Sequence, residues 1–367
     1  MRFKDGLFGR LLGTWFCISA VMALCATSAA HGQCASAPFT VQVTTTGTSI
    51  NTCTLNPLTN HWDLTVTING PVSSNSNVYI RGSNTLQLGR VKIQNNSALD
   101  SRVYILGSGF DQRIGGVGFV DKGTSGANLV LILGLSTTGN VGYDKPGNDA
   151  IRVDSIYNLS IGGSVLGRLN SEAHGRSMGN CFIQGDLTGG IYLGPVSSLD
   201  RMWIGGNLGM PDQPPVRVDV SGNITSLVAG AINADISTWI NNAAGTVAVL
   251  ETTSGAFRGS LTAHRLAEFS DGVMPGRVSI AGDLDASVTL TRDIRVPFHV
   301  GGSFRQARLV AGIPIANVIT TLTGQFDDPA AFPTSTFTVL GDFAGEMTLG
   351  VPNAAGLASI NRDVIIG

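Results

Sequence analysis

Charge is scarce in this 367-residue chain: 13% of its residues are charged, against roughly 25% in ordinary soluble domains. The 23 Lys and Arg residues nearly balance the 25 Asp and Glu residues, so the net charge is −2. This net charge is too small to steer a polyanion to the chain, and nucleic acid is not an expected partner. Proline is also scarce, with 14 residues, and glycine shows no triplet period, which excludes a collagen-like chain.

Long apolar runs are limited to one segment at the N-terminus. Arg2, Lys4 and Arg10 precede LLGTWFCISAVMALCA, and small residues follow it. This order predicts a signal peptide over residues 1–32, and hence a secreted or cell-surface protein. An uncleaved anchor is the alternative, but the run is shorter than the roughly 20 residues that span a bilayer. No transmembrane segment is expected in the mature chain.

Cysteine is rare, with 5 residues, and two of these lie inside the predicted signal peptide. Cys34 and Cys53 lie close together in what would be an oxidising compartment, so we predict a disulfide between them. Such a bridge closes a loop of about 19 residues and contributes roughly 3 kcal/mol in the chain-entropy description. Cys181 is expected to be a small buried apolar residue.

Glycine, by contrast, is abundant, with 48 residues, and it recurs within one motif. The motif appears as FIQGDL at 182–187, WIGGNL at 203–208 and SIAGDL at 279–284. Apolar residues stand two positions before and after the glycine, which is the period of a strand, and a small polar residue follows it. Aligned copies recur about every 20 residues. The glycines in this alignment are Gly163, Gly185, Gly206, Gly222, Gly245, Gly259, Gly282, Gly302, Gly324 and Gly341.

Each unit is thus predicted to be a short strand, a bend and a second short strand. One unit cannot bury its apolar face alone, but stacked copies can. We predict an all-β fold: a right-handed parallel β-helix over 78–367 with coils of about 20 residues, and a small N-terminal β cap over 33–77. The segment 234–245 fits either a helix or another coil. Val364 and Ile366 begin a further repeat, which predicts that the sequence is truncated there.

The motifs WIGGNL, FIQGDL and SIAGDL resemble the β-helix repeats of secreted bacterial surface proteins, such as autotransporter passengers and adhesins. The resemblance implies an exported structural or adhesive protein, a rigid solenoid whose loops make multivalent contacts with surface glycans or other envelope components. The alternative is a polysaccharide-binding or polysaccharide-cleaving protein of the pectin lyase kind. Those enzymes need clustered carboxylates, or an arginine with calcium-binding aspartates, and no such motif occurs in the sequence.

No catalytic, cofactor-binding or metal-binding residue is predicted. Glu172, His174 and Arg176 form a local polar cluster, but a loop between repeats usually leaves such a trio solvated. A basic band near the C-terminal end can hold an acidic glycan through bidentate contacts, or can simply face solvent. Its members, the weak candidates for ligand binding, are Arg292, Arg295, Arg305 and Arg308.

Overall fold

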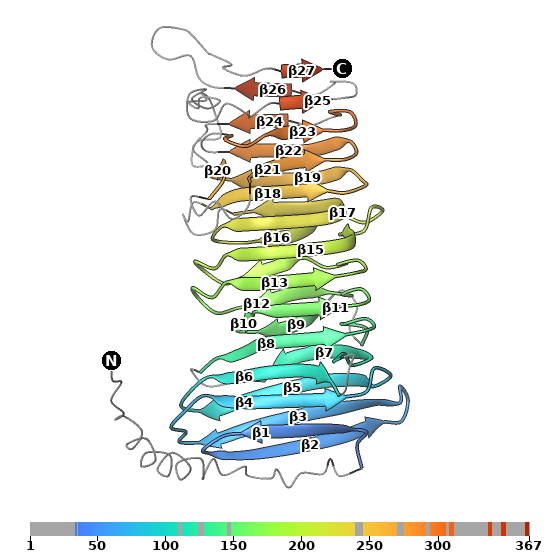
Figure 1. The fold of residues 1–367 in the computed structure, drawn as a ribbon, viewed down its shortest axis with the longest axis vertical. Coiled ribbons are helices and arrows are strands. Elements are labelled where there is room, and N and C mark those ends of the chain that lie inside the picture. The colour runs from blue at the N-terminus through green and yellow to red at the C-terminus, as the bar shows by residue number, and fades with distance from the viewer. Residues whose placement is uncertain are drawn as a thin grey trace, which may run out of the picture.

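The chain winds into a stack of strands, seen from the side in Figure 1. This computed structural model is an all-β parallel β-solenoid of about 8 turns, with coils of about 25 residues. The described part of the chain contains no helix, and so none that is long and apolar enough to cross a membrane. The residues that the structure describes are 34, 36–108, 112–123, 128–144, 148–238, 245–269, 275–290, 294–305, 308–311, 337–339, 346–349 and 364–366.

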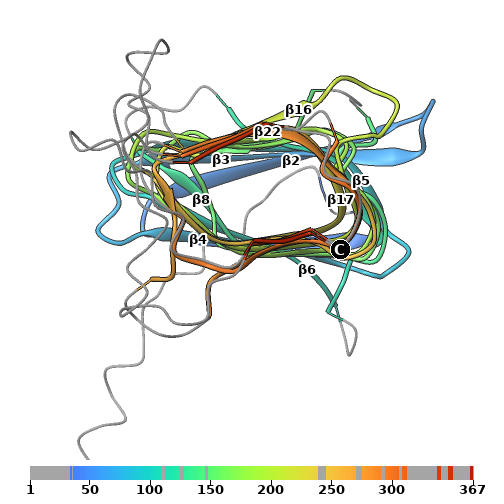
Figure 2. The ribbon, with the colours of Figure 1, turned by 90° about the horizontal axis from the view of Figure 1, so that it is seen from above.

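Parallel strands form two ladders, which lie on opposite sides of a flattened ring when the stack is seen from above (Figure 2). The first ladder contains β4 (Ser76–Gly82), β6 (Ser101–Gly107), β8 (Val130–Thr137), β10 (Ser155–Ile156), β11 (Asn158–Ile161), β13 (Met178–Ile183), β15 (Leu199–Leu208), β17 (Ile224–Ser237), β18 (Thr246–Thr252), β20 (Arg265–Leu266), β21 (Arg277–Ile280), β23 (Phe298–Val300), β25 (Phe337–Val339) and β27 (Val364–Ile366). The second contains β3 (His61–Gly70), β5 (Gln87–Ser97), β7 (Gly116–Lys122), β9 (Asp149–Val153), β12 (Arg168–Ser171), β14 (Ile191–Leu193), β16 (Val216–Asp219), β19 (Phe257–Ala263), β22 (Leu284–Leu290), β24 (Arg308–Ala311) and β26 (Glu346–Leu349). The C-terminal half of β17 also joins the second ladder.

An interior column of the first ladder confirms part of the predicted stack. Ile161, Ile183 and Ile204 pair residue by residue in successive coils, and the same column continues through Ile280 to Val339. The four isoleucines have no exposed surface. Alternation along the strands therefore stacks one side chain of each of these coils in a shared column, which is apolar except at Thr252.

The recurring glycine makes room for a polar side chain of the preceding coil. A Cβ atom at Gly206 would lie 2.3 Å from Oδ1 of Asp186, and that carboxylate accepts a hydrogen bond from the Asn207 backbone amide at 2.6 Å. A Cβ atom at Gly185 would likewise lie 2.3 Å from Oγ of Ser164. That hydroxyl accepts a hydrogen bond from the Asp186 amide at 3.0 Å. In both cases a polar residue of one coil therefore accepts a hydrogen bond from the backbone of the next coil, and the glycine of that next coil leaves the space for its side chain.

The expected coil length of about 20 residues is wrong. Paired positions in successive coils lie 18 residues apart at Ile151 and Leu169 and 39 residues apart at Phe298 and Phe337, and coils average about 25 residues. The shorter period arose because one alignment mixed glycines from different parts of the coil. Gly206 follows the buried Ile204 of the first ladder, whereas Gly259 lies in the second ladder beside Ala234. Gly222 lies at another bend, where its Cβ atom would meet Ser198.

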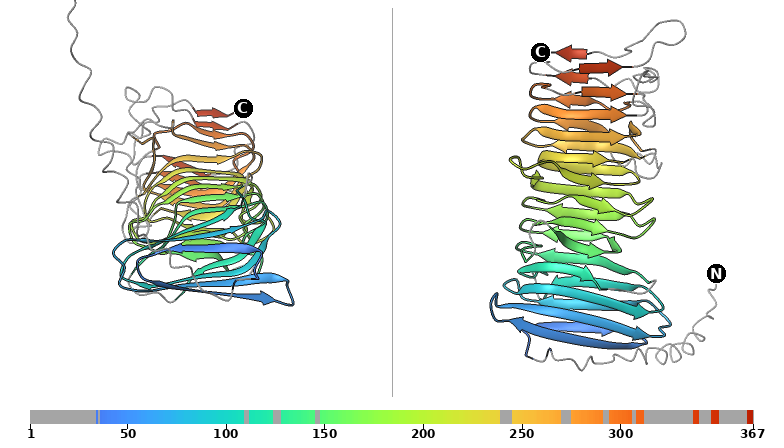
Figure 3. Two further views of the ribbon diagram at one scale, coloured as in Figure 1. Left: turned by 60° about the horizontal axis from the view of Figure 1, so that its bottom comes forward. Right: turned by 180° about the vertical axis from the view of Figure 1, so that it is seen from behind.

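The N-terminal end differs from the rest of the stack. The strands β1 (Phe39–Thr44) and β2 (Thr48–Asn56) pair antiparallel with β4 and β3, and they form the base in Figure 3. The predicted disulfide between Cys34 and Cys53 is confirmed. The parallel stack begins with β3 at His61, inside the segment expected to be the cap, because Leu64 already faces the core.

Two ambiguous segments belong to the stack. In the stretch 234–245, the first residues continue β17 up to Ser237, so they form a strand and not a helix, while 239–244 lie outside the described residues. At the other end, Val364 and Ile366 lie in β27, which pairs in parallel with β25. The C-terminal repeat is therefore a further coil of the first ladder.

Candidate ligand-binding face

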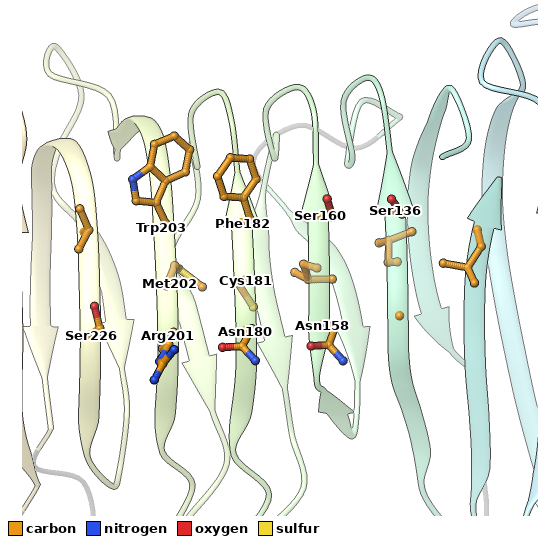
Figure 4. A pocket seen from close by; sticks show the side chains of 15 residues that line it. Ser136, Asn158, Ser160, Asn180, Cys181, Phe182, Arg201, Met202, Trp203 and Ser226 are labelled. Atoms are coloured by element: carbon orange, nitrogen blue, oxygen red, sulfur yellow. The ribbon is translucent and has the colours of Figure 1, made fainter. Parts of the chain in front are cut away.

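An aromatic pair stands on the outer face of the first ladder. Phe182 of β13 and Trp203 of β15 are paired in register, one coil apart. Their ring centroids lie 4.4 Å apart and their planes differ by 7°. Phe182 is 46% exposed and Trp203 is 38% exposed, although rings of this size are usually covered. Figure 4 shows both rings on the same side of the sheet.

A hollow of about 600 Å³ opens beside this pair. In the column that holds the two rings, the preceding coils carry Ser160 and Ser136, so small side chains replace the rings there (Figure 4). Gly134 has no side chain, and Leu106 closes the far end, 3.7 Å from the position of a Cβ atom at Gly134. The surface is therefore apolar and concave, which is typical of ligand sites.

Polar groups without partners border the hollow. Asn158, Asn180 and Arg201 form the adjacent outward column in Figure 4. The Asn158 amide donates to the Leu133 carbonyl at 3.0 Å. Within the described residues, by contrast, neither the Asn180 amide nor the Arg201 guanidinium forms a side-chain hydrogen bond or an ion pair, and the same holds for the hydroxyls of Ser136 and Ser160. These groups are free to bind a ligand.

The second ladder carries a different face, rich in charge. Its ion pairs join Lys122 to Asp154 at 2.5 Å, Lys122 to Glu172 at 2.9 Å, Arg152 to Glu172 at 2.8 Å and Arg168 to Asp149 at 2.6 Å. Part of this face borders a second hollow of about 960 Å³. Burial alone would raise the pKa of Glu172, but hydrogen bonds from Lys122 and Arg152 outweigh burial and hold the pKa below its usual value. The Glu172 carboxylate is thus ionised and already paired.

The basic band stays a prediction. Arg295 and Arg305 flank opposite ends of β23, and Arg305 lies 3.7 Å from the carboxylate of Asp283. Arg308 lies in β24, but its side chain is outside the described residues, as is all of Arg292.

The trio near residue 174 does not converge. Glu172 pairs with Lys122 and Arg152, whereas Arg176 lies 3.8 Å from Asp100. Across the described ranges, no group of three or more His, Cys, Asp or Glu residues is placed to hold a metal ion. Neither the trio nor an acidic cluster therefore offers a site as compact as the aromatic hollow.

The aromatic pair was not predicted from the sequence, although a signal was present. The motifs FIQGDL and WIGGNL begin with Phe182 and Trp203, at the same position of consecutive repeats. Since Ile183 and Ile204 point inward, strand alternation places the residue before each of them on the outer face.

The comparisons with known proteins do not add to this geometry. No protein-family model, curated protein or solved structure matches the chain. The function is therefore inferred from the two outer faces of the solenoid and from their chemistry.

Proposed function

We propose that the chain is an exported structural or adhesive surface protein whose first ladder binds surface glycans. The exposed stack of Phe182 and Trp203 beside the hollow is the observation that carries the proposal. Aromatic faces accept the C–H face of a sugar ring, and nearby amides and hydroxyls can bond to its hydroxyl groups.

The solenoid supplies rigidity for such contacts. The coils between Leu64 and Phe304 are held by ladder hydrogen bonds and by a continuous apolar core, so the binding face is ordered before the ligand arrives. Preorganisation of this kind lowers the entropy cost of binding. A long rod that meets a polymer at several points also gains affinity through multivalency. Weak single contacts are therefore enough for adhesion.

Glycan-array binding of the purified chain tests the proposal. Phe182→Ala and Trp203→Ala are each expected to weaken binding about tenfold, because one stacking contact contributes about 1–3 kcal/mol. Tyr192→Ala is the matched control, since Tyr192 is a partly exposed aromatic residue of the second ladder. Binding that is unchanged in both variants, or that falls equally in the control, would contradict the proposal.

Export is tested separately. We expect the secreted chain to begin after Ala30 or Gly32, because small residues precede both positions. Cell fractionation and N-terminal sequencing measure this directly. A chain that stays inside the cell with Met1 intact would contradict the exported role.

A polysaccharide-cleaving activity is the second candidate, and one contact favours it. The Asn170 side-chain amide donates to Asp149 at 2.9 Å and to Glu172 at 3.2 Å, so two carboxylates lie close together near the charged hollow. Glycoside hydrolysis uses two carboxyl groups about 5–9 Å apart, one of them protonated. The ion pairs oppose protonation, so we expect no release of reducing ends from acidic polysaccharides. Release that disappears in Glu172→Gln would establish this candidate instead.

A further inference from the structure

We infer that the hollow beside Phe182 is a subsite for the uronic acid residues of an acidic polysaccharide, with Arg201 receiving the sugar carboxylate. The inference rests on the proposed glycan-binding function and specifies the class of glycan. It follows from the charge of the hollow, from the position of Arg201 and from the pairing of the strands beneath.

Charge selects an anion at this hollow. Of the described residues that line it, Arg201 is the only charged one, so the lining carries a single positive charge. Burial raises the pKa of the neighbouring Asp200 carboxyl, and Arg201 partly offsets the rise, yet the two side chains form no ion pair. The guanidinium therefore keeps its donors for an incoming group. Arginine binds a carboxylate through two parallel hydrogen bonds, which fixes both position and orientation.

The position of Arg201 fits a sugar that rests on the rings. Arg201 and Trp203 lie two residues apart on β15, so both point outward from the same strand. Two residues of a strand span about 6–7 Å. Because the arginine side chain is long and flexible, its guanidinium can adjust its position to the carboxylate of a hexuronate residue that rests on the Trp203 ring. The Asn180 amide, in register with Arg201 one coil away, can donate to a ring hydroxyl.

The pairing of the strands argues against a peptide as the occupant. The strands β11, β13 and β15 each have a parallel neighbour on both sides, so their backbone groups are already bonded. A peptide cannot add as a further strand to such a face, because strand addition needs an open edge. A ligand on this face is recognised by side chains alone. Those available are rings, hydroxyls, an amide and a guanidinium, which complement the C–H face, hydroxyls and carboxylate of a uronic acid.

The test compares one polymer in two charge states. The probes are an alginate oligomer and the same oligomer after its carboxyl groups have been reduced to alcohols. Calorimetric titration of the full chain is expected to show at least tenfold tighter binding of the acidic form, with a preference that weakens as salt is raised. Arg201→Gln is expected to remove the preference while changing affinity for the reduced form less than twofold. Arg217→Gln, at an arginine of the second ladder that is 79% exposed, is the matched control and should change neither affinity.

The outcomes separate this inference from the proposed function. If wild type binds both forms equally, or fails to bind the acidic form, the inference is overturned. If glycan binding on the array still depends on Phe182 in that case, the proposed function stands without it. If Phe182→Ala and Trp203→Ala both still bind the acidic form with the affinity of wild type, the inference and the proposed function are both overturned. A preference lost equally in Arg201→Gln and Arg217→Gln overturns the inference, because it shows a long-range charge effect and no specific contact.

Discussion

Replacing Gly206 by alanine tests whether the repeat motif needs glycine to leave space for the Asp186 carboxylate of the preceding coil. The new Cβ atom would lie 2.3 Å from Oδ1 of Asp186 and 3.0 Å from the carbonyl carbon of Gly185. The Asp186 carboxylate must therefore move, and its 2.6 Å hydrogen bond to the Asn207 amide is lost. Loss of a hydrogen bond to a charged group costs about 1.5–3 kcal/mol. Residual overpacking adds about 1–3 kcal/mol, and alanine recovers about 0.5–1 kcal/mol through the unfolded chain.

The net expectation is a loss of about 1.5–5.5 kcal/mol in the free energy of unfolding. Urea unfolding followed by tryptophan fluorescence measures it, and a slope of about 2 kcal/mol per molar converts it to a midpoint shift of about 0.8–2.8 M. Gly134→Ala is the control, because the nearest atom there is 3.7 Å away, in ordinary contact. Its midpoint should change by less than about 0.5 M.

A double-mutant cycle separates the clash from other effects. In an Asp186→Ala background the carboxylate is absent, so adding Gly206→Ala should cost at least about 1 kcal/mol less than it does in wild type. Some cost remains, since the Gly185 carbonyl carbon stays 3.0 Å from the new methyl group. Equal effects in the two backgrounds, or equal midpoints for Gly206→Ala and Gly134→Ala, would refute the role assigned to the glycine.

Three further predictions concern stability. Cys53→Ala, which opens the bridge to Cys34, should destabilise the N-terminal end by roughly 3 kcal/mol. Limited proteolysis should then cut this end before the coils, and unchanged protection would contradict the prediction. Ile204→Ala should lower the free energy of unfolding by about 2–5 kcal/mol, because Ile204 has no exposed surface, and an unchanged urea midpoint would count against the shared core. The lowered pKa of Glu172 contributes stability above its ordinary value of 4.5, and this is lost as pH falls through the lower folded value. Melting temperatures of wild type and Glu172→Gln should therefore differ at neutral pH and converge as pH falls through the lowered pKa of Glu172; a constant difference would contradict this.

The sequence contained most of the fold. Apolar residues at every second position on both sides of a glycine predicted a stack of short strands, and Ile161, Ile183 and Ile204 do share one column. The coil length was not recoverable in the same way. Gly206 and Gly222 both make room for a polar cap of the preceding coil, so the same chemistry appears at two bends of the coil. Only strand pairing separates them.

The candidate site was harder to predict than the core. An inward position must be apolar, so it leaves a pattern, whereas an outward position tolerates almost any side chain. Phe182 and Trp203 form a stacked pair only because they are in register in neighbouring coils, and a single sequence does not show which residues of different coils are paired. The ion pairs of Glu172 likewise join residues of different coils, such as Lys122 and Arg152. In the sequence, Glu172 is grouped with its neighbours His174 and Arg176, because its true partners are distant along the chain.

A crystal structure of the chain with a bound alginate oligomer tests the central claim most directly. The account predicts density for a sugar ring against the stack of Phe182 and Trp203, with its carboxylate paired to Arg201. Density in the charged hollow of the second ladder, near Arg152 and Arg168, would contradict the account and move the binding site to the opposite wall.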